Sequence, residues 1–256
     1  MSTRYLRFLA RLLPLSLLAL LSGCATAPGR TSSDDPWQGM NRGIYKFNDT
    51  VDRVALKPAA KTYQKITPRW FRTGVSNFFN NLGTPWTIAN EVLQGKPQLA
   101  AHQTSRFVLN TVGGLGGVID VASKLELEAH DEDFGQTLAV WGVPSGPYLV
   151  LPAFGPSTLR DGFGRVPDYL SNPTRHADIP WETKTGLTTL DLLQTRESLL
   201  SLDDTLKQAF DPYGVMRDAW LQRREYLIFD GSPPVEDLGD MELDDEPADE
   251  PPADTK

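Results

Sequence analysis

The chain has 256 residues, with 25 Lys plus Arg, 33 Asp plus Glu, three His and one Cys, and this length allows one large domain or two small ones. Residues 231–256 hold ten acidic side chains, whereas residues 24–230 hold 21 basic and 23 acidic ones, so the pI of 4.9 is largely a property of the C-terminal tail. A nearly neutral body without a basic stripe argues against a nucleic-acid partner, and one cysteine excludes an internal disulfide or a Cys-based zinc cluster.

The N-terminus has the pattern of a secretory signal. Arg4, Arg7 and Arg11 precede a Leu-rich run at 12–21, which is too short to span a bilayer. The following Leu21-Ser22-Gly23-Cys24 resembles the lipobox of bacterial lipoproteins. We therefore expect residues 1–23 to be a signal peptide and Cys24 to be lipidated; the alternative is an ordinary signal peptide with an incidental cysteine. In the sorting rule of the lipoproteins that the lipobox resembles, a residue other than Asp after the lipidated cysteine, here Ala25, implies the outer membrane of a Gram-negative cell.

Two segments outside the body are predicted to lack regular structure. Residues 24–34 are small, polar and interrupted by Pro and Gly, as in a flexible tether. Residues 232–256 combine acids and prolines with few large apolar side chains, so we expect a disordered acidic tail. The body is then 35–231.

The first half of the body is predicted to be helical, and prolines mark the expected helix starts. Five prolines follow a possible N-cap residue and can occupy the first helical position: Asp35-Pro36, Thr67-Pro68, Thr84-Pro85, Lys96-Pro97 and Asp211-Pro212. After Pro36 the apolar positions recur every three or four residues, at Trp37, Met40, Ile44, Phe47, Val51 and Val54. We expect this helix to end before Pro58, a second to run from Pro68 to Gly83, a third from Pro85 to Gly95, and a fourth from Pro97 to the Gly113–Gly117 cluster.

The second half is predicted to be helical as well, with one undecided segment. Short helices are expected over 118–127 and 134–141, the latter ended by Gly142, and a further helix after an N-cap at Ser157. Residues 148–152 are apolar and lie between prolines, so they form either a short strand or an extended buried segment. Helices over 181–201, 203–210 and from Pro212 complete an all-α body.

No catalytic set is apparent in the sequence. The three histidines belong to no metalloprotease motif, and neither a nucleophile elbow nor a phosphate-binding loop is present. The segment His130-Asp131-Glu132-Asp133 has donors for a divalent ion, but a solvated acidic loop that caps the next helix is the favoured interpretation. We therefore predict no catalytic residue, metal or cofactor.

Glycines and tryptophans each allow two interpretations. The cluster Gly113, Gly114, Gly116 and Gly117 is interpreted as a structural bend or as a place where a backbone or a lipid chain approaches closely. The six tryptophans are ordinary core residues or, in a protein tethered to a bilayer, interfacial side chains.

Many stretches of the body, in chain order, resemble the MlaA (VacJ) lipoprotein family. The stretches that carry the resemblance are Asp35-Pro36-Trp37-Gln38-Gly39-Met40-Asn41-Arg42, Asn77-Phe78-Phe79-Asn80-Asn81-Leu82, Leu93-Gln94-Gly95, Arg106-Phe107, Gly116-Gly117, Glu132-Asp133-Phe134-Gly135-Gln136-Thr137-Leu138, Gly155-Pro156-Ser157-Thr158-Leu159-Arg160-Asp161, Asp211-Pro212-Tyr213 and Gln222-Arg223-Arg224-Glu225-Tyr226.

The resemblance implies a non-enzymatic function. Members look like helical discs in the inner leaflet of the outer membrane, with a central amphipathic channel that withdraws misplaced phospholipid from the outer leaflet. They pass the lipid to a soluble periplasmic carrier (MlaC-like), and trimeric porins of the OmpC/OmpF kind hold some of them. We expect Gly113, Gly114, Gly116, Gly117 and Phe107 to border the lipid path. The alternatives are a periplasmic lipoprotein enzyme and a structural envelope tether.

Overall fold

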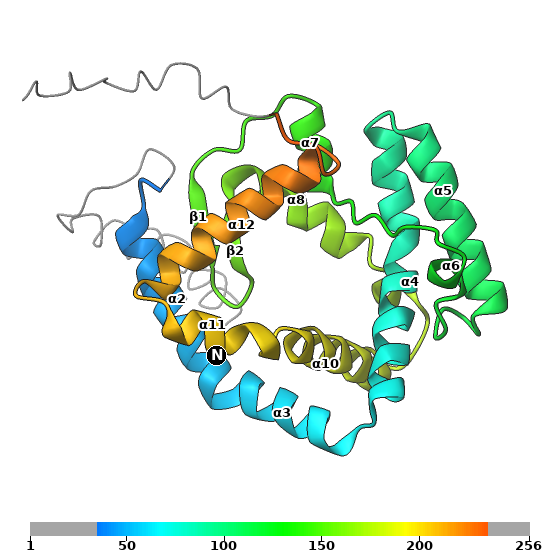
Figure 1. The fold of residues 1–256 in the computed structure, drawn as a ribbon, viewed down its shortest axis with the longest axis horizontal. Coiled ribbons are helices and arrows are strands. Elements are labelled where there is room, and N and C mark those ends of the chain that lie inside the picture. Colours follow the sequence, from blue (N-terminus) through cyan, green and yellow to red (C-terminus); the bar gives the residue numbers. More distant parts are fainter. Residues whose placement is uncertain (1–34, 235–256) are drawn as a thin grey trace, which may run out of the picture.

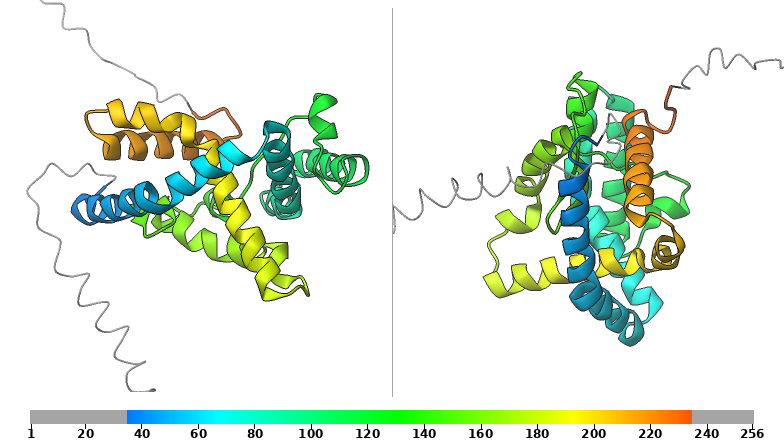
Figure 2. Two further views of the ribbon diagram at one scale, coloured as in Figure 1. Left: turned by 90° about the horizontal axis from the view of Figure 1, so that it is seen from below. Right: turned by 90° about the vertical axis from the view of Figure 1, so that its left-hand side faces the viewer.

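The computed structural model describes residues 35–234, in which the helices follow one another around a ring (Figure 1). Cys24, the expected signal peptide and tether, and nearly all of the acidic tail lie outside the described residues. Helices make up nearly all of the regular structure, and the described residues hold only two short strands. The prediction of an all-α body is therefore confirmed. Two further views show α2 (Gln38–Val51) between α8 (Leu159–Leu170) on one side and α12 (Pro212–Ile228) on the other (Figure 2).

The first helical stretch does not end before Pro58, as the sequence suggested. It continues from α2 through a π-helical turn, η1 (Asp52–Leu56), into α3 (Lys57–Ile66), with Pro58 in the first turn of α3. In the π turn the Lys57 N–H donates to the Asp52 carbonyl. Proline lacks an N–H and normally interrupts the backbone hydrogen bonds of an α-helix. Here it follows a turn in which these bonds already join residues five apart instead of four.

The second and third expected helices are one helix, α4 (Arg69–Leu93), so the predicted break at Gly83 and start at Pro85 are wrong. The Thr84 hydroxyl donates to the Asn80 carbonyl of the preceding turn at 3.0 Å instead of capping a new helix. Packing of α4 along α5 (Pro97–Val108) outweighs the local preference for a break (Figure 1). Gly95 ends α4 as predicted, with φ +73° and its N–H bonded to the Val92 carbonyl.

Of the other proline starts, Pro97 and Pro212 occupy the first helical position, while α4 begins one residue after Pro68 and α2 begins two after Pro36. After α5, a π-helical turn, η2 (Leu109–Gly113), leads into the glycine bend, as the cluster predicted.

The helix expected over 118–127 shrinks to α6 (Val121–Lys124), because Asp120 caps it by accepting the Ser123 N–H. The next helix, α7 (Phe134–Val140), ends at Gly142 as predicted, where φ is +86°. The undecided segment is a strand, β1 (Tyr148–Leu151), paired antiparallel with β2 (Gly155–Thr158). Ser157 lies in β2, and it is Thr158 that caps α8 by accepting the Asp161 N–H.

The last third of the ring is helical again. Its elements are α9 (Pro173–His176), α10 (Trp181–Ser198), the 3-10 turn η3 (Leu200–Leu202), α11 (Asp203–Gln208) and α12. No helix within residues 35–234 is long and apolar enough to cross a membrane.

Candidate functional site

The described part of the chain has an unusual division between its interior and its surface. Only seven hydrophobic side chains are buried, and the main apolar cluster is Tyr148, Val150 and Tyr213, against which Ile44 and Trp220 pack. Eighteen polar or charged residues are buried, while 32 large hydrophobic residues are exposed. Buried polar groups and an extensive apolar exterior reverse the usual pattern of a water-soluble fold. The exterior is therefore suited to a medium less polar than water.

Helix α2 illustrates this reversal. Its predicted apolar stripe is largely exposed, and Phe47 and Val54 retain 57% and 73% of their accessible surface. The adjacent face points inward: Asn41 is fully buried, Asn48 contacts the β hairpin, and Ile44 at the edge of the stripe packs against the apolar cluster. Asn48 donates to the Leu151 carbonyl at 2.9 Å and accepts from the Ala153 N–H at 2.8 Å. The helix is thus held to the ring by two amides and by Ile44, whereas Phe47 and Val51 of the stripe stay exposed.

A first buried network ties the start of the described chain to β1 and α12. The Asn41 side chain donates to Asp35 at 2.8 Å and to the Tyr148 carbonyl at 3.0 Å, and it accepts from the Val150 N–H at 2.9 Å. The Tyr213 hydroxyl donates to the second oxygen of Asp35. Burial, with the adjacent Asp35 carboxylate, raises the pKa of the Tyr213 hydroxyl, so it remains a donor throughout the physiological range.

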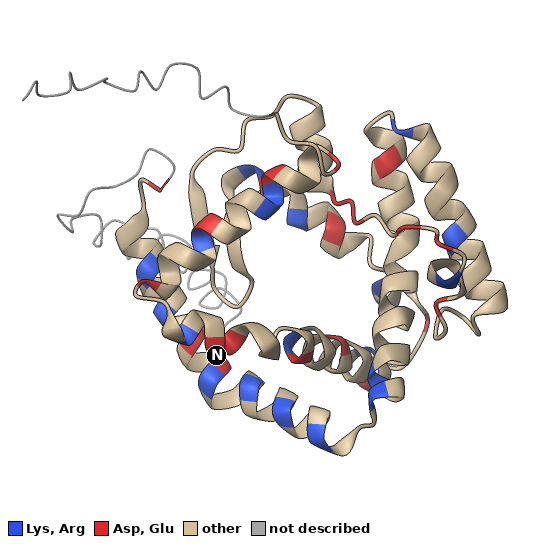
Figure 3. Cartoon of the chain, in the orientation of Figure 1, with Lys and Arg blue, Asp and Glu red and all other residues tan. Residues whose placement is uncertain are grey.

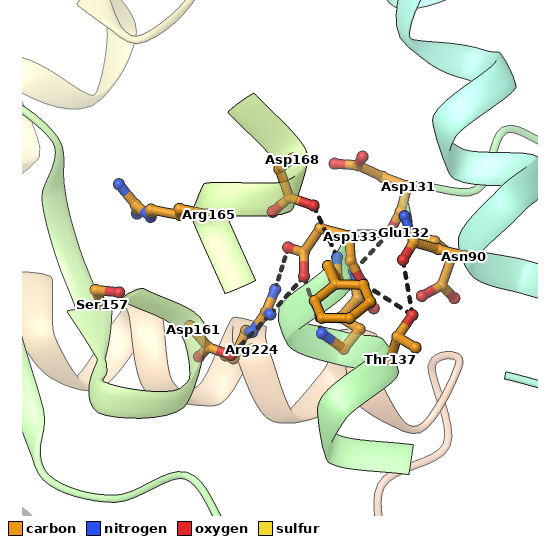
Figure 4. A network of polar contacts seen from close by, with 12 residues as sticks. Asn90, Asp131, Glu132, Asp133, Thr137, Ser157, Asp161, Arg165, Asp168 and Arg224 are labelled. Atoms are coloured by element: carbon orange, nitrogen blue, oxygen red, sulfur yellow. Dashed lines mark hydrogen bonds and ion pairs between the residues drawn. The ribbon is translucent and has the colours of Figure 1, made fainter. Parts of the chain in front are cut away.

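A second network joins α7, α8 and α12 through Arg224 (Figure 4). The Arg224 guanidinium donates to both oxygens of Asp133 at 2.6 and 2.7 Å and to Asp161 at 2.9 Å. Burial opposes ionisation of Asp161, but the Arg224 and Arg160 guanidiniums more than offset it and lower the pKa of that carboxyl. Nearby, Asp168 accepts from the Trp86 indole and the Phe134 N–H at 2.8 and 2.9 Å. This core is held by charge-assisted hydrogen bonds rather than by apolar packing.

The acidic segment 130–133 caps α7, as favoured from the sequence, but it is not simply solvated. Asp133 accepts the Gln136 N–H at 2.9 Å, while Glu132 is buried and accepts from Gln94 at 2.8 Å and from Lys96 at 3.1 Å. Glu91 lies fully buried with neither carboxylate oxygen hydrogen-bonded. Burial, together with the Glu132 charge, raises the pKa of Glu91 to about 7. Across residues 35–234 no group of three or more His, Cys, Asp or Glu side chains is placed to hold a metal ion.

The glycine bend after η2 requires at least two of its glycines for close packing. A Cβ at Gly114 would lie 2.0 Å from the Ile119 carbonyl oxygen, and one at Gly117 would lie 2.4 Å from the Cβ of Asn81. Gly116 has open space around it but a φ of +71°, and Gly113 would make only an ordinary 3.8 Å contact. The cluster is therefore a bend at which other parts of the protein approach the backbone closely, and the approach of a lipid chain stays a prediction. Phe107, expected beside the same path, is half-buried near the end of α5, before η2 and the bend.

Two cavities adjoin these networks. One of about 370 Å³ lies between α4, α5 and the segment before α7, and Asn81 and Asn110, which flank the glycine bend, belong to its wall. The other, of about 520 Å³, lies between the β1 end of the hairpin and α12, and its wall includes Tyr148, Arg160 and Arg224. The bend predicted from the glycines is therefore next to a cavity, while Cys24 lies outside the described residues.

Sequence reasoning missed the arginines of α12. The face of α12 that contacts the core repeats every three or four residues, at Tyr213, Arg217, Trp220 and Arg224. Its two arginines therefore interrupt an otherwise aromatic stripe. That spacing was a usable signal, because an arginine on a buried helix face requires an acidic partner elsewhere in the chain. The tryptophans divide between both interpretations: Trp37, Trp70, Trp141 and Trp181 are exposed, whereas Trp86 and Trp220 are partly buried.

A ring of helices with a polar interior and an apolar exterior defines a class of proteins suited to contact with lipid. The chain belongs to the MlaA lipoprotein family, because the sequence model of that family matches residues 33–227. It is 38% identical over 229 residues to the intermembrane phospholipid transport system lipoprotein MlaA of Shigella flexneri, covering 86% of this chain and 90% of that one. The MlaA of Haemophilus influenzae is 35% identical, covering 85% and 89%.

A solved structure described as "Structural basis for maintenance of bacterial outer membrane lipid asymmetry" matches the fold with a TM-score of 0.67. It is 35% identical in sequence, and the match covers 76% of this chain and 98% of that one.

Proposed function

We propose that this protein is a phospholipid-transport lipoprotein that withdraws misplaced phospholipid from the outer leaflet of the outer membrane and passes it to a periplasmic carrier. The observation that carries the proposal is the reversed interior and exterior of the ring, joined to membership of a family whose named relatives belong to an intermembrane phospholipid transport system. Removing a lipid from a bilayer needs an apolar wall for acyl chains and polar groups for the head, and it needs no reaction.

Seating in the periplasmic leaflet is supported by the surface around α3. Val54, Ile66 and Trp70 are each more than 70% exposed on the stretch from η1 to α4, and basic side chains, all of them Lys, recur along α3 (Figure 3). Such a surface can place its apolar side chains among acyl chains while its basic side chains reach the headgroup phosphates. Together with acylation at Cys24, it would hold the ring in the leaflet without a spanning helix. A Cys24→Ala variant should remain unprocessed or soluble.

The lipid path is proposed to run beside the glycine bend, bordered by Gly113, Gly114, Gly116, Gly117 and Phe107. Support comes from the adjacent cavity, to which the bend contributes through its contacts with Asn81 and Asn110. Two partners are proposed for the finer steps: a trimeric porin of the OmpC/OmpF kind that positions the ring, and an MlaC-like carrier that accepts the lipid.

Three functions are distinguished by one experiment on the purified acylated protein, in which it is incubated with radiolabelled phospholipid, separated from free lipid and extracted. Intact bound lipid supports transport. Hydrolysed lipid supports the alternative of a lipoprotein enzyme, and neither bound nor hydrolysed lipid supports a structural envelope tether. Heat-denatured protein is the control for nonspecific retention.

A further inference from the structure

The basic side chains of the body are unevenly distributed along the chain. Residues 53–90 contain six of them and no acidic residue, whereas residues 24–52 and 91–230 contain 15 basic and 23 acidic ones. The six recur every three or four residues, at Arg53, Lys57, Lys61, Lys65, Arg69 and Arg72. Within η1 and α3 this spacing places each about one helical turn after the last, so they form a basic row from η1 through α3 to the start of α4 (Figure 3).

Two members of the basic row have structural partners. Lys57 Nζ lies 2.6 Å from an Asp203 carboxylate oxygen, and this pair holds α3 to α11. Arg72 Nε lies 3.1 Å from a Glu197 carboxylate oxygen, and this pair holds α4 to α10. All four side chains are largely buried, so these two positive charges are compensated within the ring.

The middle of the basic row lacks such partners. Lys61, Lys65 and Arg69 are exposed, and none of the ion pairs within residues 35–234 involves them. Arg53 has only a surface contact with Asp49, at 3.5 Å. Like charges one helical turn apart repel each other and disfavour the helix, so an anion bound along this row would stabilise it.

Large apolar side chains lie directly beside these cations. Ile66 follows Lys65 and is 73% exposed, and Trp70 follows Arg69 and is 75% exposed. The Trp70 ring packs edge-on against Phe71, with 6.0 Å between the ring centroids. Tryptophan is enriched where the headgroups of a membrane meet its acyl chains, and Lys and Arg can extend from there to the phosphates. The surface therefore matches a ligand that is both anionic and apolar.

The acidic tail of the same chain is another anionic partner that the sequence offers. Residues 231–256 hold ten acidic side chains but few large apolar ones. Binding of the tail would compensate the cations and leave Ile66 and Trp70 without apolar contacts. An anionic phospholipid supplies both the charge and the acyl chains, so the surface favours the lipid.

We propose that Lys61, Lys65 and Arg69 bind the headgroups of anionic phospholipids, while Ile66 and Trp70 lie among the acyl chains. The leaflet around α3 is then enriched in anionic lipid. Each Lys or Arg near an anionic membrane surface strengthens the attraction by about fivefold. The inference rests on the proposed function, because it names the class of lipid that the seated ring contacts; it leaves open which lipid is transported.

The test places the full acylated protein in vesicles that hold equal amounts of phosphatidylglycerol and phosphatidylcholine. One of the two lipids carries brominated acyl chains, which quench the fluorescence of nearby tryptophans such as Trp70, and in a second preparation the bromine is on the other lipid. We expect stronger quenching by brominated phosphatidylglycerol, equivalent to a preference of roughly fivefold or more. High salt should remove most of this preference, because it screens exposed charges.

The double variant Lys61→Gln with Lys65→Gln removes two of the three cations and should reduce the preference to less than about twofold. Glutamine has a helix propensity close to that of lysine, and both positions are exposed, so we expect the fold to be retained. Lys124→Gln with Arg223→Gln removes two exposed cations elsewhere on the ring. This matched control should keep the wild-type preference.

Equal quenching by the two lipids in the wild type, or the same loss of preference in both double variants, would overturn the assignment while leaving phospholipid transport intact. A preference that appears only after truncation at Gly231 would overturn it in favour of the acidic tail as the occupant of the basic row. Absence of quenching by either lipid would contradict membrane contact, and with it both the assignment and the proposed function.

Discussion

Arg224 near the end of α12 holds Asp133 at the start of α7 through two parallel hydrogen bonds of 2.6 and 2.7 Å, although the two residues are 91 positions apart. The same guanidinium reaches Asp161 of α8, so one side chain fixes three helices around the ring. Only 9% of the Arg224 side chain is exposed. A buried charge of this kind stabilises the fold only as long as all its partners are present.

Replacing Arg224 with Met should therefore destabilise the protein strongly. The buried Asp161 and the partly exposed Asp133 would lose their shared counter-ion, and we expect a loss of about 3–5 kcal/mol in the free energy of unfolding. Urea denaturation followed by circular dichroism measures this. Arg223→Met, at the exposed neighbouring position, should change stability by less than about 0.5 kcal/mol. Equal stability of the two variants would mean that the Arg224 network contributes little.

Glu91 should make stability depend on pH in a definite direction. Its folded-state pKa of about 7 lies above the ordinary value of 4.5, so the folded protein holds this proton more tightly than the unfolded chain. The contribution is fully present below about pH 4.5 and is lost as pH rises through 7. Glu91→Gln should hence be more stable than wild type by about 1–3 kcal/mol at pH 8 and similar to it at pH 4.5. A difference that does not change between these pH values would show that Glu91 titrates normally.

Substitutions in the glycine bend should distinguish steric clash from backbone strain as the cause of lost stability. Gly117→Val places a branched side chain against Asn81 at a φ of +91°, so we expect a protein that fails to accumulate. Gly116→Val, in open space, should cost only the backbone strain, about 1–2 kcal/mol. Gly113→Ala makes an ordinary contact and is the control. Immunoblots of whole cells, with melting curves of the soluble variants, rank the three; a well-tolerated Gly117→Val would remove the packing explanation.

The exposed stripe of α2 and η1 should contribute to membrane contact independently of the lipid anchor. Val54→Asp in a form lacking acyl chains should weaken binding to phospholipid vesicles by roughly fivefold to tenfold, since a charge replaces an apolar side chain at the interface. Ala59→Asp, also exposed but on another side of the same helical stretch, controls for added negative charge. Vesicle flotation gives the bound fraction. If both variants bind equally, the stripe does not face lipid.

The acidic tail should be dispensable for folding. Truncation after Gly231 retains Asp230, whose carboxylate pairs with Lys96 at 2.6 Å, and removes residues whose composition offers little apolar surface to bury. The melting temperature should change by less than about 2 °C. A larger decrease would indicate that the tail docks on the body.

Much of this fold follows from local patterns in the sequence, because prolines, glycines and apolar spacing act over a few residues. The starts at Pro97 and Pro212 and the stops at Gly95 and Gly142 were predicted in this way. Pro85 was misread because packing along α5 keeps α4 continuous, and such packing lies outside any local window.

The candidate site was less predictable, because it is made by contacts between distant segments. Asn41 binds the β1 backbone 107 positions away, and Arg224 binds Asp133 91 positions away. No local sequence pattern indicates either pair. The apolar stripe of α2 was predicted correctly as a stripe, but periodicity alone does not tell which medium an apolar face meets. In this fold most of the stripe is exposed, and the side that packs inward carries Asn41 and Asn48 together with Ile44.

The central claim, that the protein withdraws phospholipid from a membrane, is tested most directly by transfer from vesicles. The full acylated protein is reconstituted into vesicles that hold a fluorescent phospholipid, and a soluble lipid-binding acceptor is added. If the protein withdraws phospholipid, fluorescence moves to the acceptor faster in the presence of the folded protein than with heat-denatured protein or with empty vesicles. Equal transfer rates in all three samples would contradict the central claim.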